Sequence, residues 1–250
     1  MINISIEDWN KTQPSPLLRD REVHLWRVEL ERDRTETDLL FELLSDDECE
    51  RANKYRFSKD RSHFVVGRAT LRKIIGGYLG VSPEKIVFSI RHYGKPYLSG
   101  VDRDLRFNVT HSNGVAVIAV TKGRELGVDI EFFNPEFDIF SVAPSVFTSI
   151  EVSHLRSLAA NLQTAVFFAG WTRKEAFLKA MGDGLSSSNE LQPAVSFFSD
   201  EDVSFDLLDN GRKTKWSLTS FLIQDDFKAA LAVEGKMRTF SFYKLIENVS

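Results

Sequence analysis

The chain has 250 residues, of which 42% are hydrophobic and 27% are charged, a balance typical of a folded protein with one large domain or two smaller ones. Its formal net charge of −4 argues against general binding to nucleic acid or to anionic membranes. The single cysteine, Cys49, excludes an internal disulfide and a zinc site built on several cysteines. No stretch reaches the roughly 18 apolar residues of a membrane span or has the pattern of a signal peptide, so we expect a cytoplasmic protein.

Periodicity in the first half of the chain predicts helices and strands. Ser45, with Glu48 three positions later, has the pattern of a capping box and indicates a helix start. A long helix with a basic polar face is expected from Ser58 to Gly80, where a glycine ends the apolar periodicity. Strands are predicted at residues 22–30, at residues 85–98 as a strand that runs into a Gly-Lys-Pro turn, and three times within residues 105–133.

The second half shows a similar order of elements but no repeat of the sequence. Residues 134–147 have the composition of a loop, residues 148–160 predict a short helix, and residues 161–182 predict a long helix that stops at Gly182-Asp183-Gly184. Strands are predicted at residues 194–199, 215–223, 228–233 and 239–245. Because strands follow helices in both halves, we expect an α+β protein with an N-terminal half at residues 1–121 and a C-terminal half at residues 122–250.

Two acidic residues stand in a segment that otherwise predicts a buried strand. In LGVDIEFF, residues 126–133, alternation places Val128 and Ile130 on one face and Asp129 and Glu131 on the other. The Cα atoms of the two acids then lie about 6.6 Å apart, and at an effective dielectric constant of about 20 their charges repel by about 2.5 kcal/mol. The acids are therefore either solvated at a sheet edge or placed to bind a cation.

A third acid and a lysine share a helix face farther along the chain. In GWTRKEAFLKAMG, residues 170–182, helical spacing puts Glu175 and Lys179 on one stripe with Trp171 and Leu178. An exposed ion pair at this spacing contributes about 0.2–0.5 kcal/mol and seldom shares a stripe with aromatic residues. The alternative is that Glu175 joins the strand acids around Mg²⁺, which prefers oxygen ligands and shares its shell with substrate phosphates.

Other residues suit a ligand rich in phosphate. Thr110, His111 and Ser112 lie where a strand meets a turn, so hydroxyl, imidazole and backbone N–H groups can converge on an anion. In the turn Gly94-Lys95-Pro96 the glycine lets a ligand approach the backbone and the proline fixes it. Each of these residues taken alone also fits a structural role. Basic residues that could hold a further phosphate lie along the first helices, at Arg51, Arg68 and Arg72.

Taken together, these motifs resemble one enzyme family. YGKPYL, FNVTHSNGVAVIAV, GVDIE and WTRKEAFLKAMGDGL occur in the order and approximate spacing of the Sfp-type 4′-phosphopantetheinyl transferases. The resemblance covers roughly residues 22–243, and the pairing of GVDIE with the later WTRKEAFLK is highly specific. It implies two similar α+β halves related by a pseudo-twofold axis, with coenzyme A bound and the active site formed in the cleft between them.

The resemblance also implies roles for individual residues. Asp129, Glu131 and Glu175 match the family's three acids that bind Mg²⁺ together with the coenzyme A pyrophosphate. Lys179 matches the lysine that contacts phosphate, and His111 matches the histidine at the pyrophosphate. The remaining matches lie on the nucleotide side and comprise Thr110 near the nucleotide, Gly94, Lys95 and Pro96 beside the adenine, and Arg51 near a position that contacts the 3′-phosphate. Thr110 replaces the family's usual serine and keeps the hydroxyl, whereas Glu48 stands where some relatives have a basic residue.

The implied activity is transfer of the 4′-phosphopantetheine arm of coenzyme A to a serine hydroxyl of an apo acyl, peptidyl or polyketide carrier protein. Mg²⁺ and Lys179, with His111, would neutralise charge on the pyrophosphate, and either Glu175 or a water held by the metal would take the serine proton. We expect a monomer that binds coenzyme A and an acidic carrier protein, with no nucleic acid and no membrane as partner. Two alternatives stay open: another Mg²⁺-dependent hydrolase of nucleotides or coenzyme A, and a non-catalytic scaffold that binds coenzyme A or a carrier.

Overall fold

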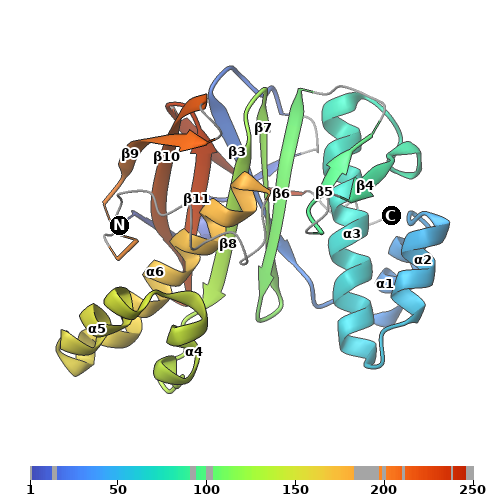
Figure 1. Ribbon diagram of the computed structural model, residues 1–250. Coiled ribbons are helices and arrows are strands. Elements are labelled where there is room, and N and C mark those ends of the chain that lie inside the picture. Colours follow the sequence, from blue (N-terminus) through green and yellow to red (C-terminus); the bar gives the residue numbers. More distant parts are fainter. Residues whose placement is uncertain are drawn as a thin grey trace.

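Two mixed sheets and two long helices make up most of the molecule (Figure 1). A computed structural model describes residues 2–12, 16–90, 94–99, 104–182, 197–198, 201–209, 212–237 and 239–245. The helices are α1 Arg34–Phe41, α2 Asp46–Asn53, α3 Ser58–Leu79, α4 Ile139–Val146, α5 Ser149–Ser157 and α6 Ala160–Met181. The strands are β1 Ile2–Ile4, β2 Asn10–Thr12, β3 Glu22–Glu29, β4 Phe88–Ile90, β5 Pro96–Leu98, β6 Leu105–Ser112, β7 Val115–Lys122, β8 Leu126–Phe132, β9 Val203–Asp209, β10 Arg212–Ile223, β11 Phe227–Glu234 and β12 Thr239–Leu245.

The first sheet has the strand order β2-β12-β3-β7-β6 and packs against α3. β3, β7 and β6 pair antiparallel, whereas β12 pairs parallel with β3. Trp26 of β3 and Ile118 of β7 pack with Ile74 and Ile75 of α3 in one buried cluster. Gly80 follows α3 in the left-handed conformation, at φ 66°, which confirms the predicted end of that helix.

The second sheet has the strand order β1-β10-β11-β8, with β9 also paired to β10. α6 crosses β8 and β11 on one face of this sheet (Figure 1). Ala176 and Phe177 of α6 pack there with Trp216 and Leu218 of β10. No helix in the described part of the chain is long and apolar enough to cross a membrane.

A further hydrophobic cluster joins the two sheets. Leu25 and Val117 of the first sheet pack with Val128 and Ile130 of β8. Because side chains along a strand alternate between its faces, β8 turns its two acids away from this core and toward α6. The division of β8 into an apolar face and an acidic face, predicted from the sequence, is confirmed.

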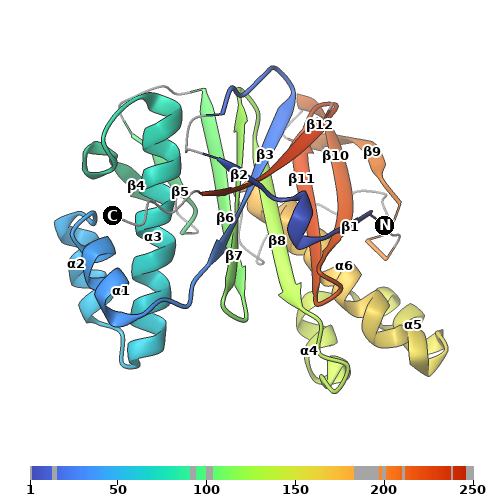
Figure 2. The same cartoon turned by 180° about the vertical axis from the view of Figure 1, so that it is seen from behind.

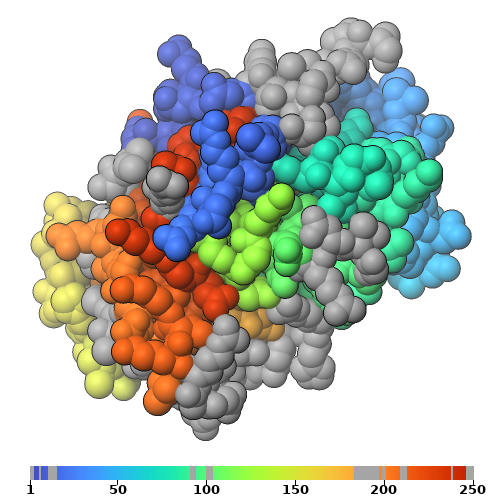
Figure 3. Space-filling model, turned by 90° about the horizontal axis from the view of Figure 1, so that it is seen from above, coloured from blue at the N-terminus to red at the C-terminus, as the bar shows by residue number. Residues whose placement is uncertain are grey.

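The two ends of the chain cross between the halves. β1 pairs with β10 in the second sheet, and β12 pairs with β2 and β3 in the first. Figure 2 shows these strands from behind, and in Figure 3 the N-terminal segment lies against the C-terminal strands. Backbone hydrogen bonds therefore link strands from the first half of the chain to strands from the second half, in addition to the shared core.

Some elements differ from the sequence prediction. Residues 139–146 form α4, and the prediction of a loop there is wrong. Pro144 lies inside this helix, and because proline has no N–H to donate, the segment lacks the usual signature of a helix. α1, β1, β2 and β9 have no counterpart in the prediction. Of the strand predicted at residues 194–199, only residues 197–198 are described, and they form a turn; Asp183 and Gly184 lie outside the described residues.

Candidate active site

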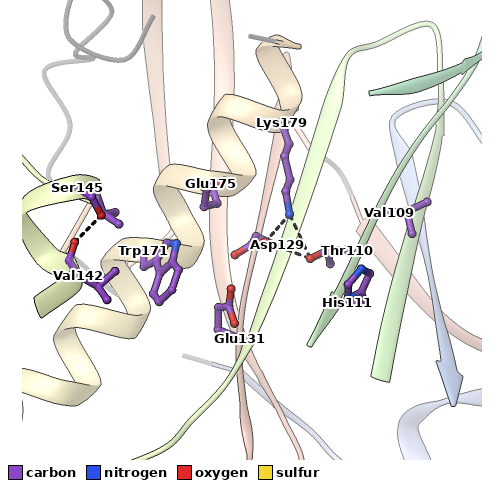
Figure 4. A pocket seen from close by; sticks show the side chains of 11 residues that line it. Val109, Thr110, His111, Asp129, Glu131, Val142, Ser145, Trp171, Glu175 and Lys179 are labelled. Carbon is purple, nitrogen blue, oxygen red and sulfur yellow. Dashed lines mark hydrogen bonds and ion pairs between the residues drawn. The ribbon is translucent and has the colours of Figure 1, made fainter. Parts of the chain in front are cut away.

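A pocket of about 480 Å³ lies between β6, β8, α4 and α6 (Figure 4). It brings together six of the predicted site residues, namely Thr110 and His111 from β6, Asp129 and Glu131 from β8, and Glu175 and Lys179 from α6. β6 is an edge strand of the first sheet, whereas β8 and α6 belong to the second. The pocket therefore lies where the two halves meet.

Gly127 allows α6 to pack directly on the backbone of β8. A Cβ atom at this position would lie 2.1 Å from the carbonyl oxygen of Ala176 and 2.3 Å from the nitrogen of Ala180, far inside van der Waals contact. Ala176 and Ala180 follow Glu175 and Lys179 directly in the sequence. The absence of a side chain at Gly127 therefore sets how closely Glu175 and Lys179 approach the acids of β8.

Asp129 is deeply buried and carries hydrogen bonds on one oxygen only. Its Oδ1 accepts from the Lys179 ammonium at 2.5 Å and from the Thr110 hydroxyl at 3.1 Å. Lys179 also donates to Thr110 Oγ1 at 3.2 Å. The Oδ2 of Asp129 is buried and has no hydrogen-bond donor among the described residues. Burial raises the pKa of Asp129, and the positive charge of Lys179 opposes that rise.

Glu131 has a hydroxyl donor in place of the charged partner that Asp129 has. Its Oε2 accepts a hydrogen bond from the Ser112 hydroxyl at 3.1 Å, and no lysine or arginine forms an ion pair with it in the described structure. Burial, followed by the negative charge of Asp129, raises the pKa of Glu131 to about 7. Lys179 thus pairs with Asp129, whereas Glu131 has no ion-pair partner in the described structure.

Glu175 occupies the helix side of the pocket, one turn after Trp171 and one turn before Lys179 (Figure 4). The exposed i, i+4 ion pair considered for Glu175 and Lys179 is not formed, because Lys179 pairs with Asp129 instead. Burial, followed by the charge of Asp129, raises the pKa of Glu175. A half-buried carboxyl group with a raised pKa is suited to accept a proton.

His111 lies at the solvent-exposed rim of the pocket. Desolvation, followed by the positive charge of Lys179, lowers the pKa of the imidazole. The ring is therefore neutral at physiological pH and can donate one hydrogen bond. Together with Lys179 it gives the pocket two donors for an anionic ligand.

The predicted adenine-side turn does not line this pocket. Lys95 directs its ammonium to the carbonyl oxygens of Leu126, at 3.0 Å, and Ala180, at 3.4 Å, and its side chain is only 9% exposed. Gly94 is exposed and has φ 85°, and Pro96 begins β5. Lys95 thus joins the first half to the ends of β8 and α6.

The three arginines considered for phosphate binding lie outside the pocket as well. Arg72 is buried and donates to the Glu48 carboxylate at 2.7 Å, and Arg68 lies 3.5 Å from the same carboxylate. Glu48 also accepts from the backbone N–H of Ser45 at 3.1 Å, which confirms the predicted capping box. Arg51 is exposed on α2, with its guanidinium group over an aromatic ring.

The oxygen donors of the pocket suit a hard divalent cation. Asp129, Glu131 and Glu175 all offer carboxylate oxygens, and the Oδ2 of Asp129 lacks any donor in the described structure. Within the described ranges, however, no three acidic, histidine or cysteine side chains are gathered closely enough to make a complete metal site. Mg²⁺ commonly takes one or two carboxylates and fills its shell with water and substrate phosphate. The residues therefore fit a cation that shares a phosphate ligand.

Sequence reasoning missed one wall of the pocket and one polar residue that lies beside the pocket without lining it. Val142, Ser145 and Val146 of α4 line the pocket, in a segment predicted to be a loop. Asn108 accepts a hydrogen bond from the backbone N–H of Val128 at 2.9 Å and was not singled out. The signal for Asn108 is the period of two in Asn-Val-Thr-His-Ser, residues 108–112, which places three polar side chains on one face of β6.

Comparison with known proteins gives matches over both halves. Residues 125–232 match a family model described as the 4′-phosphopantetheinyl transferase superfamily, and residues 30–123 match one described as 4′-phosphopantetheinyl transferase, N-terminal. The chain is 37% identical over 229 residues to the 4′-phosphopantetheinyl transferase HetI of Nostoc sp., covering 91% of this chain and 94% of that protein. It is 29% identical over 175 residues to the 4′-phosphopantetheinyl transferase Sfp of Bacillus subtilis, covering 70% of this chain and 76% of that protein.

Proposed function

The chain belongs to the 4′-phosphopantetheinyl transferase superfamily, and from this premise we propose that it transfers the 4′-phosphopantetheine group of coenzyme A to a serine hydroxyl of an apo carrier protein. Adenosine 3′,5′-bisphosphate is the second product. The observation that carries the proposal is the pocket itself, where a histidine and a threonine of one half face three acids and a lysine of the other.

Asp129, Glu131 and Glu175 are the proposed ligands of Mg²⁺. When bound, the cation supplies positive charge to the pyrophosphate and so stabilises charge that develops as the bond to phosphorus breaks. Asp129 offers its free Oδ2 without giving up its hydrogen bonds to Lys179 and Thr110. Glu131 accepts a hydrogen bond from the Ser112 hydroxyl on Oε2.

Lys179 and His111 are the proposed donors to the pyrophosphate. Lys179 stands over Asp129 on the rigid helix α6, and His111 stands across the pocket on β6 (Figure 4). The imidazole of His111 contributes a directed hydrogen bond, and Lys179 contributes a full charge. Donors fixed in this way favour the transition state because they need little reorganisation when the charge develops.

Glu175 is the proposed general base. The serine of the carrier must lose its proton as its oxygen attacks phosphorus, and Glu175 is the pocket acid bound by neither Lys179 nor a hydroxyl donor in the described structure. The serine proton therefore moves to Glu175 while the leaving oxygen stays with the bisphosphate.

The rest of the proposal concerns ligands and organisation. Residues 1–121 provide the nucleotide side and residues 122–250 the acids and the catalytic helix. Arg51, exposed on α2, is the proposed contact for the 3′-phosphate, and the turn at Lys95 is the proposed neighbour of the adenine. We propose a monomer that acts in the cytosol.

The experiment is intact-mass spectrometry of a panel of apo carrier proteins incubated with the enzyme, coenzyme A and Mg²⁺. We expect one carrier or more to gain a single phosphopantetheine at its serine. Consumption of coenzyme A without any carrier would instead indicate a hydrolase, and binding without turnover would indicate a scaffold. A folded enzyme that modifies no carrier of a broad panel contradicts the proposal.

A further inference from the structure

The edges of the two sheets meet at β6 and β8 without forming a strand ladder. β6 is the last strand of the first sheet, and β8 is the last strand of the second. The two strands nevertheless lie side by side (Figure 1). An unpaired edge leaves backbone N–H groups that need acceptors.

Side chains of β6 supply those acceptors. Asn108 Oδ1 accepts from the backbone N–H of Val128 at 2.9 Å, and Ser112 Oγ accepts from that of Phe132 at 3.0 Å. Between them, Thr110 Oγ1 lies 3.4 Å from the donating nitrogen of Ile130. Three alternate residues of β6 therefore accept hydrogen bonds from three alternate N–H groups of β8, in register.

Two of these side chains are hydroxyls, and each also donates a hydrogen bond to an acid of β8. The Thr110 hydroxyl donates to Asp129 Oδ1 and the Ser112 hydroxyl donates to Glu131 Oε2, each at 3.1 Å. Each hydroxyl thus accepts from the backbone of β8 and donates to the acid one residue before that N–H. A hydroxyl that is fixed in both directions leaves its carboxylate partner little freedom to rotate.

We propose that Ser112 is a positioning residue for Glu131, which orients this carboxylate toward the pocket and fixes it relative to β6. This inference rests on the proposed function, in which Glu131 is a ligand of Mg²⁺. Thr110 plays the same part for Asp129, but Asp129 is also held by Lys179, whereas Ser112 is the hydroxyl donor to Glu131. Ser112 was expected from the sequence to help bind an anion, and the structure directs its hydroxyl to a carboxylate instead.

The chain offers a matched control. Asn108 makes the same kind of bond to β8 as Ser112 does, but within the described residues it bonds to no acid of the pocket. Asn108→Ala therefore removes a strand-joining bond alone, and Ser112→Ala removes a strand-joining bond together with the bond to Glu131. Ser112→Thr keeps the hydroxyl and suits a strand.

The test is a calorimetric titration of Mg²⁺ into each variant in the presence of coenzyme A, with the melting midpoint measured in parallel. Loss of a residue that orients a metal ligand typically weakens metal binding about 10- to 100-fold. We expect a loss of about tenfold or more in Ser112→Ala, near-normal Mg²⁺ affinity in Ser112→Thr, and a lowered melting midpoint with near-normal Mg²⁺ affinity in Asn108→Ala.

Wild-type Mg²⁺ affinity in Ser112→Ala would overturn the proposal, as would equal losses in Ser112→Ala and Asn108→Ala. Failure of the wild-type protein to bind Mg²⁺ with coenzyme A present would overturn it too. In the transfer assay, Ser112→Ala should raise the Mg²⁺ concentration that gives the half-maximal rate more than it lowers kcat. If the wild type modifies no carrier but Ser112→Ala still loses Mg²⁺ affinity, the proposed function fails and the positioning role stands.

Discussion

The ammonium nitrogen of Lys179 lies 2.5 Å from Oδ1 of Asp129, so a lysine of α6 neutralises the most deeply buried acid of the pocket. Before any ligand binds, the site therefore already contains one compensating cation. Lys179 links the helix that carries Glu175 to the strand that carries Asp129, and its side chain is 31% exposed on the pocket side. It can thus serve both the fold and the anionic ligand.

Lys179→Ala should lower both stability and activity. Removing the lysine leaves Asp129 buried without its charged partner, and breaking a buried pair in this way typically costs about 3–5 kcal/mol, an upper limit here because the lysine is partly exposed. Mg²⁺ should restore more of the melting midpoint in the variant than it adds to the wild type, since it replaces the lost charge. Differential scanning calorimetry with and without Mg²⁺ tests this, and a variant as stable as the wild type without metal would contradict it.

Glu131→Gln should change how the stability of the metal-free protein depends on pH. The pKa of Glu131 is raised from 4.5 to about 7 in the folded state, so the folded protein holds this proton more tightly than the unfolded chain does. The contribution of Glu131 to stability is therefore fully present below about pH 4.5 and is lost as the pH rises to about 7. Glutamine stays neutral, so the variant should be more stable than the wild type at pH 8.

Chemical unfolding at several pH values between 5 and 8, in a chelating buffer, measures this difference. The gap between variant and wild type should widen as the pH rises. If the free energy of unfolding changed with pH in the same way in both proteins, the pKa of Glu131 would not be raised in the metal-free protein.

Gly127→Ala should disrupt the packing of α6 on β8. The new methyl group would lie 2.1 Å from the backbone oxygen of Ala176, and a backbone atom cannot move aside without shifting the helix. Overpacking of this kind costs typically about 1–3 kcal/mol and sometimes more. We expect a lower melting midpoint and a loss of transfer activity, because Glu175 and Lys179 move with the helix.

Gly67→Ala is the matched control for that substitution. Gly67 lies in α3, where a Cβ atom would meet only Leu30 Cδ2, at 3.5 Å, an ordinary contact. Alanine in a helix interior is favoured over glycine by about 0.5–1 kcal/mol, so this variant should keep or gain stability. If Gly127→Ala behaved like Gly67→Ala, the close packing at β8 would not matter for the site.

Lys95→Ala and Arg51→Ala should differ in their effect on stability, although the sequence predicts a coenzyme A contact for both. The Lys95 ammonium binds backbone oxygens of Leu126 and Ala180 across the two halves, so its loss should lower the melting midpoint. Arg51 is exposed, and its removal should leave stability within about 0.5 kcal/mol while weakening coenzyme A binding. Calorimetric titration of coenzyme A and thermal melts separate the two effects; equal melting midpoints would contradict the role given to Lys95.

Local pattern was enough to predict the elements that build the pocket. Alternation in LGVDIEFF gave the correct faces of β8, and helical spacing gave the stripe of Glu175 and Lys179. The pairing partners of charged side chains could not be obtained in this way. Lys179 and Asp129 are 50 residues apart in the chain. Their bond depends on how closely α6 packs on β8, and that distance is set by the missing side chain at Gly127.

Long-range pairing and a helix that contains a proline account for the main errors. β12 enters the first sheet from the end of the chain, and no periodicity within residues 239–245 indicates a partner as distant as β3. Pro144 disguises α4, whose residues Val142, Ser145 and Val146 complete the pocket wall. Lys95 was interpreted from its neighbours in the turn, whereas its acceptors come from β8 and α6.

The most direct test compares the wild type with Glu175→Gln in one assay of holo-carrier formation at saturating coenzyme A and Mg²⁺, followed by intact mass. Glutamine is a good helix former, so the variant should keep the melting midpoint of the wild type. Loss of a general base typically costs about 10²- to 10⁴-fold in rate. We expect the carrier to gain one phosphopantetheine with the wild type, and the folded variant to modify it about a hundredfold or more slowly. Equal rates of modification by the two proteins would contradict the assignment of this pocket as the site of transfer.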